Sequence, residues 1–542
     1  MTTSQTETGS GHEPSSSAGG AGKWMALSAA LLGWMFDGAE MGLFSMVGRA
    51  AIQDLLGYGT SPTKEQEGMI GFYFGVVIAV FLVGAATGGV LFGWLGDRIG
   101  RVRAMSLSVL TYALFTGLCG IVKRPEHIAV LRFIAALGMG GEWSLGVALV
   151  MEVWPNRSRG LIAGLIGAAA NVGYLTVGVI GLGLSAILAR LGEWLATTGL
   201  PPDWVSALVA YKGWRLMMLL GCTPALLTFF FRLFVPESEK WERERGTGST
   251  SHWATRDLLG VLIGALGPGL IIFVWACRYP ASWSTSSVAI TRTLGSIAGL
   301  VIATFGYLWP VRRYVERYTA HAATLTNGGS AVPQASRIIR RMLLAAGLSG
   351  IALAGTWAST QSAPTWADKL TEGKFHSREY TQIWLAAGAC VGTIAAALAG
   401  DRFGRRITYL FLCLGSLGSA LWLFIMNQSY GDGRAFLASA FVAGACTASF
   451  YGWLPLYLPE LFETKVRATG QGFGFNFGRI LAAVGALQGG VLNTMFPNDI
   501  VIAGVTIKGG YPVACSTMSL IYIVGMAIIW LAPETKGKPL PD

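Results

Sequence analysis

The sequence predicts an all-α membrane protein made of two six-helix bundles with two extra helices between them. Composition is the first reason: 53% of the 542 residues are hydrophobic and 13% are charged, whereas soluble chains carry about 25% charged residues. Long apolar runs along the whole chain are the second reason. The third is a charged phrase, Gly-Asp-Arg-x-Gly-Arg, which closes one apolar run at 96–101 and another at 400–405. Such a repeat indicates a duplicated bundle, as in many transporters.

Each helix is predicted from the length of an apolar run, since about 20 apolar residues cross a bilayer. Six runs come first, near 24–47, 69–95, 104–122, 127–153, 160–189 and 214–235. Two more lie between polar segments, near 257–277 and 293–311, and Pro268 interrupts the first of these. Six more follow, near 339–360, 380–400, 407–427, 435–457, 468–492 and 511–532.

The polar segments divide the chain into five parts. We expect a disordered tail at 1–22, an N-terminal six-helix bundle at 23–240, a central linker with the two extra helices at 241–336, a C-terminal six-helix bundle at 337–535 and a short tail at 536–542. The first tail is rich in Ser, Gly and Thr and has no hydrophobic core. It is therefore not expected to be a cleaved signal peptide.

Charge and cysteine content exclude several classes of protein. The net charge is +11, but the basic residues are not gathered in one long run, which argues against nucleic-acid binding and for a basic cytoplasmic face. We expect a multi-pass protein of the plasma or bacterial inner membrane with both termini in the cytoplasm. Seven cysteines stand singly, so we expect no metal site, no disulfide framework and no cofactor.

The repeated charged phrases are predicted to act as gates. In each half the phrase is followed by a glutamate and then, at the same spacing, by an arginine. Charge-assisted bonds from these residues could join the two halves on one face and break when the halves rock. The alternative is a basic loop that only sets orientation. The gating candidates are Asp97, Arg98, Arg101, Glu152, Arg159, Asp401, Arg402, Arg405, Glu460 and Arg467.

Several of these phrases resemble the major facilitator superfamily. Gly93 to Arg101 is similar to its helix 2–3 loop signature, and Arg132 with Gly138 is similar to its helix 4 signature. Pro236-Glu237-Ser238 and Pro533-Glu534-Thr535-Lys536-Gly537 resemble the ends of the two bundles in the sugar-porter-like branch. The resemblance covers nearly the whole chain and implies the major facilitator fold.

Three further stretches resemble the metabolite:proton symporters of that branch. They are Asp37-Gly38-Ala39-Glu40, Gly140-Gly141-Glu142-Trp143 and Glu152-Val153-Trp154-Pro155. The first is similar to the D-G-x-D phrase of the aromatic acid:proton symporters, with Glu in place of the second Asp. The two extra central helices resemble those of the sialate:proton symporter group, to which the chain looks closest.

Acidic residues inside the apolar runs are candidates for proton coupling, because a charge at bilayer depth needs a partner or a task. Asp37 and Glu40 lie on one face of the first helix, and two close carboxylates resist ionising together. The alternative is a helix-end pair solvated by headgroup water. Glu142, in the fourth run, is either a second proton site or a structural acceptor.

Two arginines inside the runs are candidates for binding an anion. We expect Arg132 to face the acids of the first helix or the substrate. Arg479 stands as far after Glu460 as Asn171 stands after Glu152, so Arg479 and Asn171 occupy equivalent positions in the repeat. Arg479 could bind a substrate carboxylate or an acidic partner on another helix. Further candidates facing a cavity are Asn171, Tyr174, Trp357, Gln361, Gln382, Tyr451 and Asn476.

These observations favour a secondary transporter, not an enzyme, since neither a metal-ligand cluster nor a Gly-x-Ser-x-Gly elbow occurs. We expect a monomer in the lipid bilayer that uses the proton gradient to move a small organic anion, such as sialate, another sugar acid or a simpler carboxylate. The alternatives are a sugar or other metabolite carrier of the same superfamily, and a non-transporting receptor on the same fold.

Overall fold

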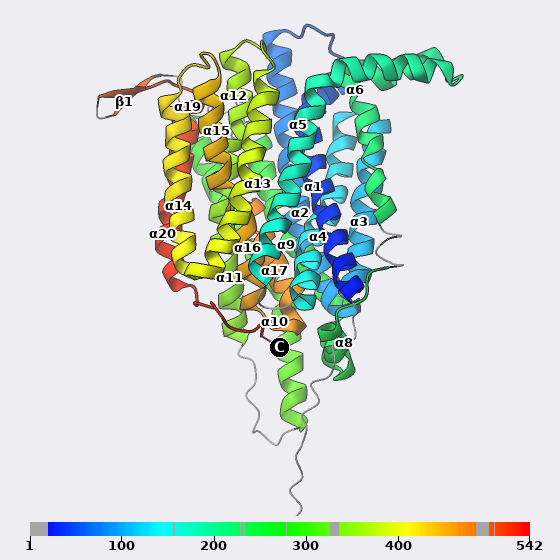
Figure 1. Ribbon diagram of the computed structural model, residues 1–542, viewed down its shortest axis with the longest axis vertical. Coiled ribbons are helices and arrows are strands. Elements are labelled where there is room, and N and C mark those ends of the chain that lie inside the picture. The colour runs from blue at the N-terminus through cyan, green and yellow to red at the C-terminus, as the bar shows by residue number, and fades with distance from the viewer. Residues whose placement is uncertain are drawn as a thin grey trace, which may run out of the picture.

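The chain folds into an elongated bundle of helices that run side by side (Figure 1). The computed structural model describes residues 20–154, 158–227, 230, 234–277, 279–280, 282–325, 335–480, 482–483, 498–502 and 504–541. One end of the bundle carries α8 (Glu239–Gly246), the lower part of α10 (Thr285–Leu325) and the C-terminal segment, and the other carries the strand β1 (Ile500–Ile502). We call the first the signature end, because the repeated phrases at 96–101 and 400–405 lie there.

The N-terminal half contains six long helices. They are α1 (Gly20–Leu55), α2 (Lys64–Ile99), α3 (Arg101–Leu118), α4 (Pro125–Val153), α5 (Arg159–Thr197) and α6 (Pro202–Leu220), with short η1 (Cys119–Ile121) and η3 (Thr223–Ala225). The helix α6 is broken at Ala210–Gly213, where Tyr211 and Lys212 have positive φ. The sequence predicted only the part of α6 that follows this break.

The repeated phrase forms a tight helix-to-helix junction rather than the expected loop. The helix α2 begins with a capping box between Thr63 and Gln66 and continues through the Gly-Asp-Arg residues to Ile99. Gly100 has a φ of 112°, which favours glycine, and α3 begins at the next residue. Gly404, with a φ of 96°, separates α13 from α14 in the same way. The charged side chains are therefore fixed by helical backbone.

The central linker carries two long helices next to a small cap at the signature end. Its elements are α8 (Glu239–Gly246), η4 (Ser249–His252), η5 (Thr255–Asp257), α9 (Leu258–Ala276) and α10 (Thr285–Leu325). The Tyr307 hydroxyl of α10 lies 2.7 Å from the Thr87 hydroxyl of α2, and both residues are buried. Arg317 pairs with Asp257 at 2.5 Å, which joins the polar end of α10 to the cap. The sequence predicted that polar end as linker without a helix.

The C-terminal half repeats the plan with more breaks. Its elements are α11 (Ala335–Ala358), η6 (Thr360–Ser362), α12 (Ala363–Leu370), α13 (Ser377–Phe403), α14 (Arg405–Leu421), η7 (Trp422–Met426), α15 (Arg434–Thr447), α16 (Phe450–Tyr457), η8 (Leu458–Leu461), η9 (Thr464–Val466), α17 (Arg467–Asn476), β1 (Ile500–Ile502), β2 (Val505–Ile507), α19 (Tyr511–Ser519), α20 (Ile521–Ile528) and η10 (Ile529–Leu531). The strands pair antiparallel, with Ile500 opposite Ile507. The sequence did not predict these strands, because they lie between two apolar runs of membrane length, near 468–492 and 511–532.

Eleven helical stretches within the described ranges are long and apolar enough to cross a membrane. Both members of the central pair are among them, as Thr255–Ala276 and Ser286–Ala320. The 36-residue α1 is not, although it packs inside the bundle. The predicted runs near 214–235 and 468–492 lie partly outside the described residues. The chain is thus a multi-pass membrane protein, and the domain boundaries given above stay predictions.

Candidate functional site

A cavity of about 110 Å³ lies between the two halves, near the middle of the helices that form it. Its walls come from α1, α4 and α5 on one side and from α11, η6, α16 and the segment after α17 on the other. The lining residues are Trp34, Asp37, Gly38, Met41, Met139, Trp143, Ile166, Gly167, Ala170, Asn171, Tyr174, Leu353, Trp357, Gln361, Tyr451, Phe475 and Arg479. Aromatic rings dominate this surface, and it carries one acid and one arginine.

Asp37 and Arg479 bring opposite charges to the cavity from opposite halves. Asp37 is 7% exposed and Arg479 is 9% exposed, and the charge of each acts on the other. Within the described part of the chain, Asp37 Oδ1 and Arg479 Nη1 have no hydrogen-bond partner. The indole Nε1 of Trp34, which also lines the cavity, has no partner there either. Three buried polar atoms therefore remain available to a ligand in the cavity.

Glu142 stands behind Asp37, outside the cavity lining. It is 2% exposed, and its side chain lies against Gly33 of α1, next to the carboxyl group of Asp37. The Glu142 and Asp37 carboxyl groups share a side-chain hydrogen bond. Two of the three predicted acids, Asp37 and Glu142, thus meet at one place, where a proton can pass between them.

Arg132 and Glu40 form a separate buried ion pair, so Arg132 faces an acid of the first helix as expected. The Arg132 guanidinium lies between the rings of Phe44 and Phe81, 4.3 Å from each centroid. Neither Arg132 nor Glu40 lines the cavity. The two acids of α1 therefore face different arginines, one in each half of the protein.

Asn171 and Arg479, the equivalent positions of the repeat, both line the cavity. The Asn171 amide donates to Gly167 O within its own helix at 2.8 Å. The two halves thus present at equivalent places a neutral, self-bonded amide and a cation whose Nη1 has no hydrogen-bond partner among the described residues. Trp357 and Tyr451 also line the cavity, as the sequence predicted.

Polar bonds close the cavity at the end opposite the signature end. Tyr174 donates its hydroxyl proton to Gln361 Oε1 at 3.1 Å, and Gln382 donates to Tyr174 O at 3.1 Å. Arg378 donates to Ser45 O at 2.7 Å. Each bond joins the N-terminal half to the C-terminal half. Gln382, predicted to bind substrate, lies behind Tyr174 and does not line the cavity.

Aromatic and amide groups close the other side of the cavity. Trp143 of α4 stacks on Phe475 of α17 with ring centroids 3.6 Å apart. Asn476, another predicted ligand, instead donates to Gly140 O at 3.0 Å. Gln471 donates to Ser144 O. These contacts again join the two halves, so the cavity is closed on both sides.

Asp97 joins the halves at the signature end. Its carboxylate accepts from Thr469 N at 2.9 Å, from the Thr469 hydroxyl at 2.6 Å and from Ala468 N at 3.3 Å, all at the start of α17. Arg101 of its own half donates to the same carboxylate at 2.7 Å. The fully buried carboxylate is therefore bonded on both sides, at a helix N-terminus that favours negative charge.

Glu152 completes this network between Arg101 and Arg467. Arg101 Nη2 lies 3.3 Å and Arg467 Nη1 lies 2.7 Å from Glu152 Oε1, and all three side chains are fully buried. In the second half, the equivalent pair Arg405–Glu460 is bonded at 2.6 Å. That pair lies within the C-terminal half. Among the described residues, the ion pairs of the duplicated motif cross between the halves in the first copy and lie within the C-terminal half in the second.

The remaining gating candidates lie at the edges of this network. Arg98 donates to Thr255 in the linker cap at 2.9 Å, and Arg402 lies over the Phe403 ring. Asp401 is 43% exposed at its side chain and lies 3.7 Å from Arg405. Arg159 is buried, and the charges of Glu460 and Asp401 act on it.

Two glutamates outside the membrane spans support the helices that follow the repeated phrases. Glu237 accepts from the backbone N–H groups of Arg101 and Val102, and Glu534 accepts from those of Arg405 and Arg406. Burial raises the pKa of Glu237 above its usual value. For Glu534, burial also raises the pKa, but backbone hydrogen bonds outweigh it and the net pKa is lowered.

The sequence did not predict several residues of the cavity lining, among them Trp34, Met41, Trp143 and Phe475. Trp34 and Met41 stand one turn either side of Asp37, so the helical spacing could have placed them on its face. Trp143 follows the predicted Glu142 directly. Phe475 and Arg378 carried no such signal, since their roles depend on how the two halves meet.

A family model described as "Sugar (and other) transporter" matches residues 25–260 and 367–542. The chain belongs to this transporter family. The interval between the two matched ranges contains α10 and most of α9. The same interval also contains α11, the first helix of the C-terminal half.

Relatives of nearly full length transport small organic molecules. The chain is 23% identical over 500 residues to the cis,cis-muconate transport protein of Acinetobacter baylyi, covering 92% of this chain and 94% of that protein. It is 23% identical over 523 residues to the niacin transporter of the same bacterium, covering 94% and 93%. It is 25% identical over 494 residues to an inner membrane metabolite transport protein of Escherichia coli, covering 90% and 88%.

Solved structures share the fold. The major facilitator superfamily proton:xylose symporter XylE, bound to 6-bromo-6-deoxy-D-glucose, superposes with a TM-score of 0.60 at 18% identity, covering 96% of this chain and 98% of the other. The human organic anion transporter MFSD10 superposes with a TM-score of 0.57 at 14% identity, covering 94% and 99%. The predicted major facilitator fold is confirmed.

Proposed function

We propose that the protein is a proton-coupled carrier of a small organic anion that works by alternating access, with the signature end in the cytoplasm. The observation that carries this proposal is the pair Asp37 and Arg479. One buried acid and one buried cation face the same closed cavity from opposite halves, and each keeps an unbonded polar atom.

The coupling follows from competition for Arg479. While Asp37 is ionised, its charge compensates the Arg479 guanidinium, and an incoming carboxylate meets a negative neighbour. When Asp37 binds a proton, Arg479 loses its compensating charge and can hold a substrate carboxylate by two parallel bonds. Glu142, next to Asp37, is placed to supply or accept that proton. Proton and anion thus enter together.

The closed cavity is favoured in the carrier without ligands and in the carrier that holds both the proton and the anion, and this supports symport. Without ligands, the opposite charges of Asp37 and Arg479 draw the two halves together. With Asp37 protonated, a bound anion does the same through Arg479. A carrier with one of the two ligands holds an uncompensated buried charge, which is costly at bilayer depth. Exchange between the two open states is therefore expected with both ligands or with neither.

The lining of the cavity favours a small planar carboxylate. Trp34, Trp143, Trp357, Tyr451 and Phe475 offer ring faces. Among the polar lining residues, Asn171 and Tyr174 already donate to protein acceptors. Few groups remain for the hydroxyls of a sugar, and about 110 Å³ suits a small acid. The relatives whose names give muconate and niacin agree with this choice, whereas sialate remains an expectation from the sequence resemblance.

The test is uptake into proteoliposomes of labelled nicotinate, cis,cis-muconate, sialate and xylose, each with and without an inward proton gradient. We expect the gradient to drive accumulation of one of the two planar acids. Accumulation of xylose alone would favour the sugar carrier, and sialate alone would favour the sialate group. Uptake of a planar acid that ignores the gradient would contradict proton coupling.

A further inference from the structure

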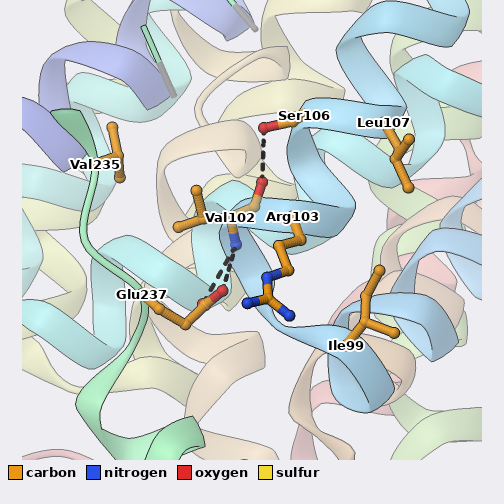
Figure 2. A pocket seen from close by; sticks show the side chains of 7 residues that line it. All are labelled: Ile99, Val102, Arg103, Ser106, Leu107, Val235 and Glu237. Carbon is orange, nitrogen blue, oxygen red and sulfur yellow. Dashed lines mark hydrogen bonds between the residues drawn. The ribbon is translucent and has the colours of Figure 1, made fainter. Parts of the chain in front are cut away.

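A second cavity, of about 560 Å³, opens on the outside of the bundle at the signature end. Figure 2 shows its residues: Ile99 at the end of α2, four residues of the first turns of α3, Val235 at the end of the sixth predicted run, and Glu237 two residues later. It is separate from the transport cavity and shares no residue with it. We call it the α3 groove.

The walls of the α3 groove continue the lipid-facing surface of α3. Leu107 lines the groove, and Leu110 and Leu114 follow it along the same face of the helix. Their side chains are 47%, 45% and 48% exposed. This apolar stripe leads from the membrane-spanning part of α3 to the groove, so an acyl chain lying along it would end there.

Arg103 stands at the polar end of the same stripe. It is exposed, lines the groove and forms no ion pair or hydrogen bond with any described residue, in contrast to Arg101 two positions earlier. The other polar groups of the groove are already bonded. Glu237 accepts from the backbone of Arg101 and Val102, and Ser106 donates to Val102 O at 2.9 Å. Arg103 is thus the one side chain in the groove with free donors.

We propose that the α3 groove binds an anionic phospholipid of the leaflet at the signature end. The phosphate is held by the Arg103 guanidinium, whose fork of donors matches phosphate oxygens. One acyl chain lies along Leu107, Leu110 and Leu114. An apolar stripe that ends at a cation with free donors is complementary to an anionic phospholipid, which carries both an acyl chain and a phosphate.

The position of the groove gives the lipid a structural consequence. Glu237 lines the groove, and the next residue, Ser238, donates to Glu152, which joins the two halves through Arg467. A bound lipid therefore packs against the segment that supports this connection. We expect the bound lipid to raise the melting temperature of the protein. We also expect it to stay bound during purification.

The experiment is native mass spectrometry of the full-length, detergent-purified protein titrated with phosphatidylglycerol or with phosphatidylcholine of the same acyl chains. The variants are Arg103→Gln and, as a matched control, Arg243→Gln. Arg243 is an exposed arginine of α8 at the same end of the molecule and does not line the groove. Melting temperatures with each lipid, which need no transport activity, give a second readout.

We expect the wild type and Arg243→Gln to retain phosphatidylglycerol in preference to phosphatidylcholine. Arg103→Gln should lose about fivefold of that preference, which corresponds to about 1 kcal/mol for one basic residue near an anionic headgroup. Leu107→Trp, which fills the groove, should lower retention of both lipids. Equal retention of the two lipids by the wild type, or an unchanged preference in Arg103→Gln, would overturn the proposal.

Discussion

Replacing Asp97 with alanine should open the signature end, whereas replacing Asp401 should not. The two residues occupy the same place in the repeated phrase, but their surroundings differ. Asp97 is fully buried and accepts three hydrogen bonds from the start of α17 in the other half. The Asp401 side chain is 43% exposed and lies 3.7 Å from Arg405 of its own half.

The expected sizes follow from these contacts. A hydrogen bond to a charged group contributes about 1.5–3 kcal/mol, so losing three that share one carboxylate should cost at least about 3 kcal/mol. Since 1.4 kcal/mol is a factor of ten, the ratio of open to closed molecules should rise about 100-fold. An exposed ion pair contributes about 0–1 kcal/mol, so Asp401→Ala should change that ratio less than about fivefold.

Ser144 offers a reporter for the opening. It is fully buried, it faces Gly472 across the seam, and cysteine has nearly its shape. In a background without the seven native cysteines, the rate at which Ser144→Cys reacts with a maleimide measures how often the signature end opens. The rate should rise steeply with Asp97→Ala and little with Asp401→Ala.

Equal labelling of the Asp97→Ala and Asp401→Ala variants would refute this prediction. If both alanine variants fold, express equally and label at the same rate, the hydrogen bonds of Asp97 do not close the signature end. The repeated phrases would then act only on membrane orientation. A larger effect for Asp401→Ala would mean that the second copy of the phrase forms the connection between the halves.

Three further predictions concern the anion site, the central pair and the C-terminal segment. Arg479→Gln should weaken binding of the acid at least about 30-fold, since losing one partner of a buried charge pair costs about 2 kcal/mol or more. Binding of the neutral amide analogue of that acid should weaken much less. Equal losses for acid and amide in a binding assay would point to Arg132 instead. Tags placed at 278–284 should be reached from outside intact cells and tags at 246 and 328 should not; if none is reached, α9 and α10 form a hairpin that does not cross. Deleting residues 538–542 removes the Pro541 carbonyl that accepts from Arg467 and should raise Ser144→Cys labelling, while Lys508→Gln, at the opposite end, should leave it unchanged.

Much of the fold could be predicted because it depends on local patterns. Apolar runs of bilayer length gave the helices, and the central pair was found although Pro268 interrupts its first member. The pairing of Arg132 with Glu40 was anticipated because an arginine inside a helix needs an acid, and the first helix has two. The equivalence of Asn171 and Arg479 followed from counting along the repeat.

What could not be predicted depends on how the two halves meet. Asp97 and Asp401 have the same neighbours in the sequence, yet Asp97 accepts hydrogen bonds from the start of α17. Asp401 lies against Gly160 at the start of α5, and its side chain stays 43% exposed. Gln382 and Asn476 looked like ligands by type, but each donates to a backbone carbonyl of the other half. The stacking of Trp143 on Phe475 joins residues whose separation in the chain hides any pattern.

The central claim is that Asp37 couples proton binding to anion binding at Arg479. The most direct measurement compares wild type and Asp37→Asn in proteoliposomes, with both concentrative uptake under an inward proton gradient and exchange of labelled for unlabelled substrate without a gradient. We predict that Asp37→Asn keeps exchange, because the neutral amide of Asn leaves Arg479 free for the substrate carboxylate. The same variant should lose concentrative uptake altogether. A variant that still concentrates the substrate against its gradient would contradict it.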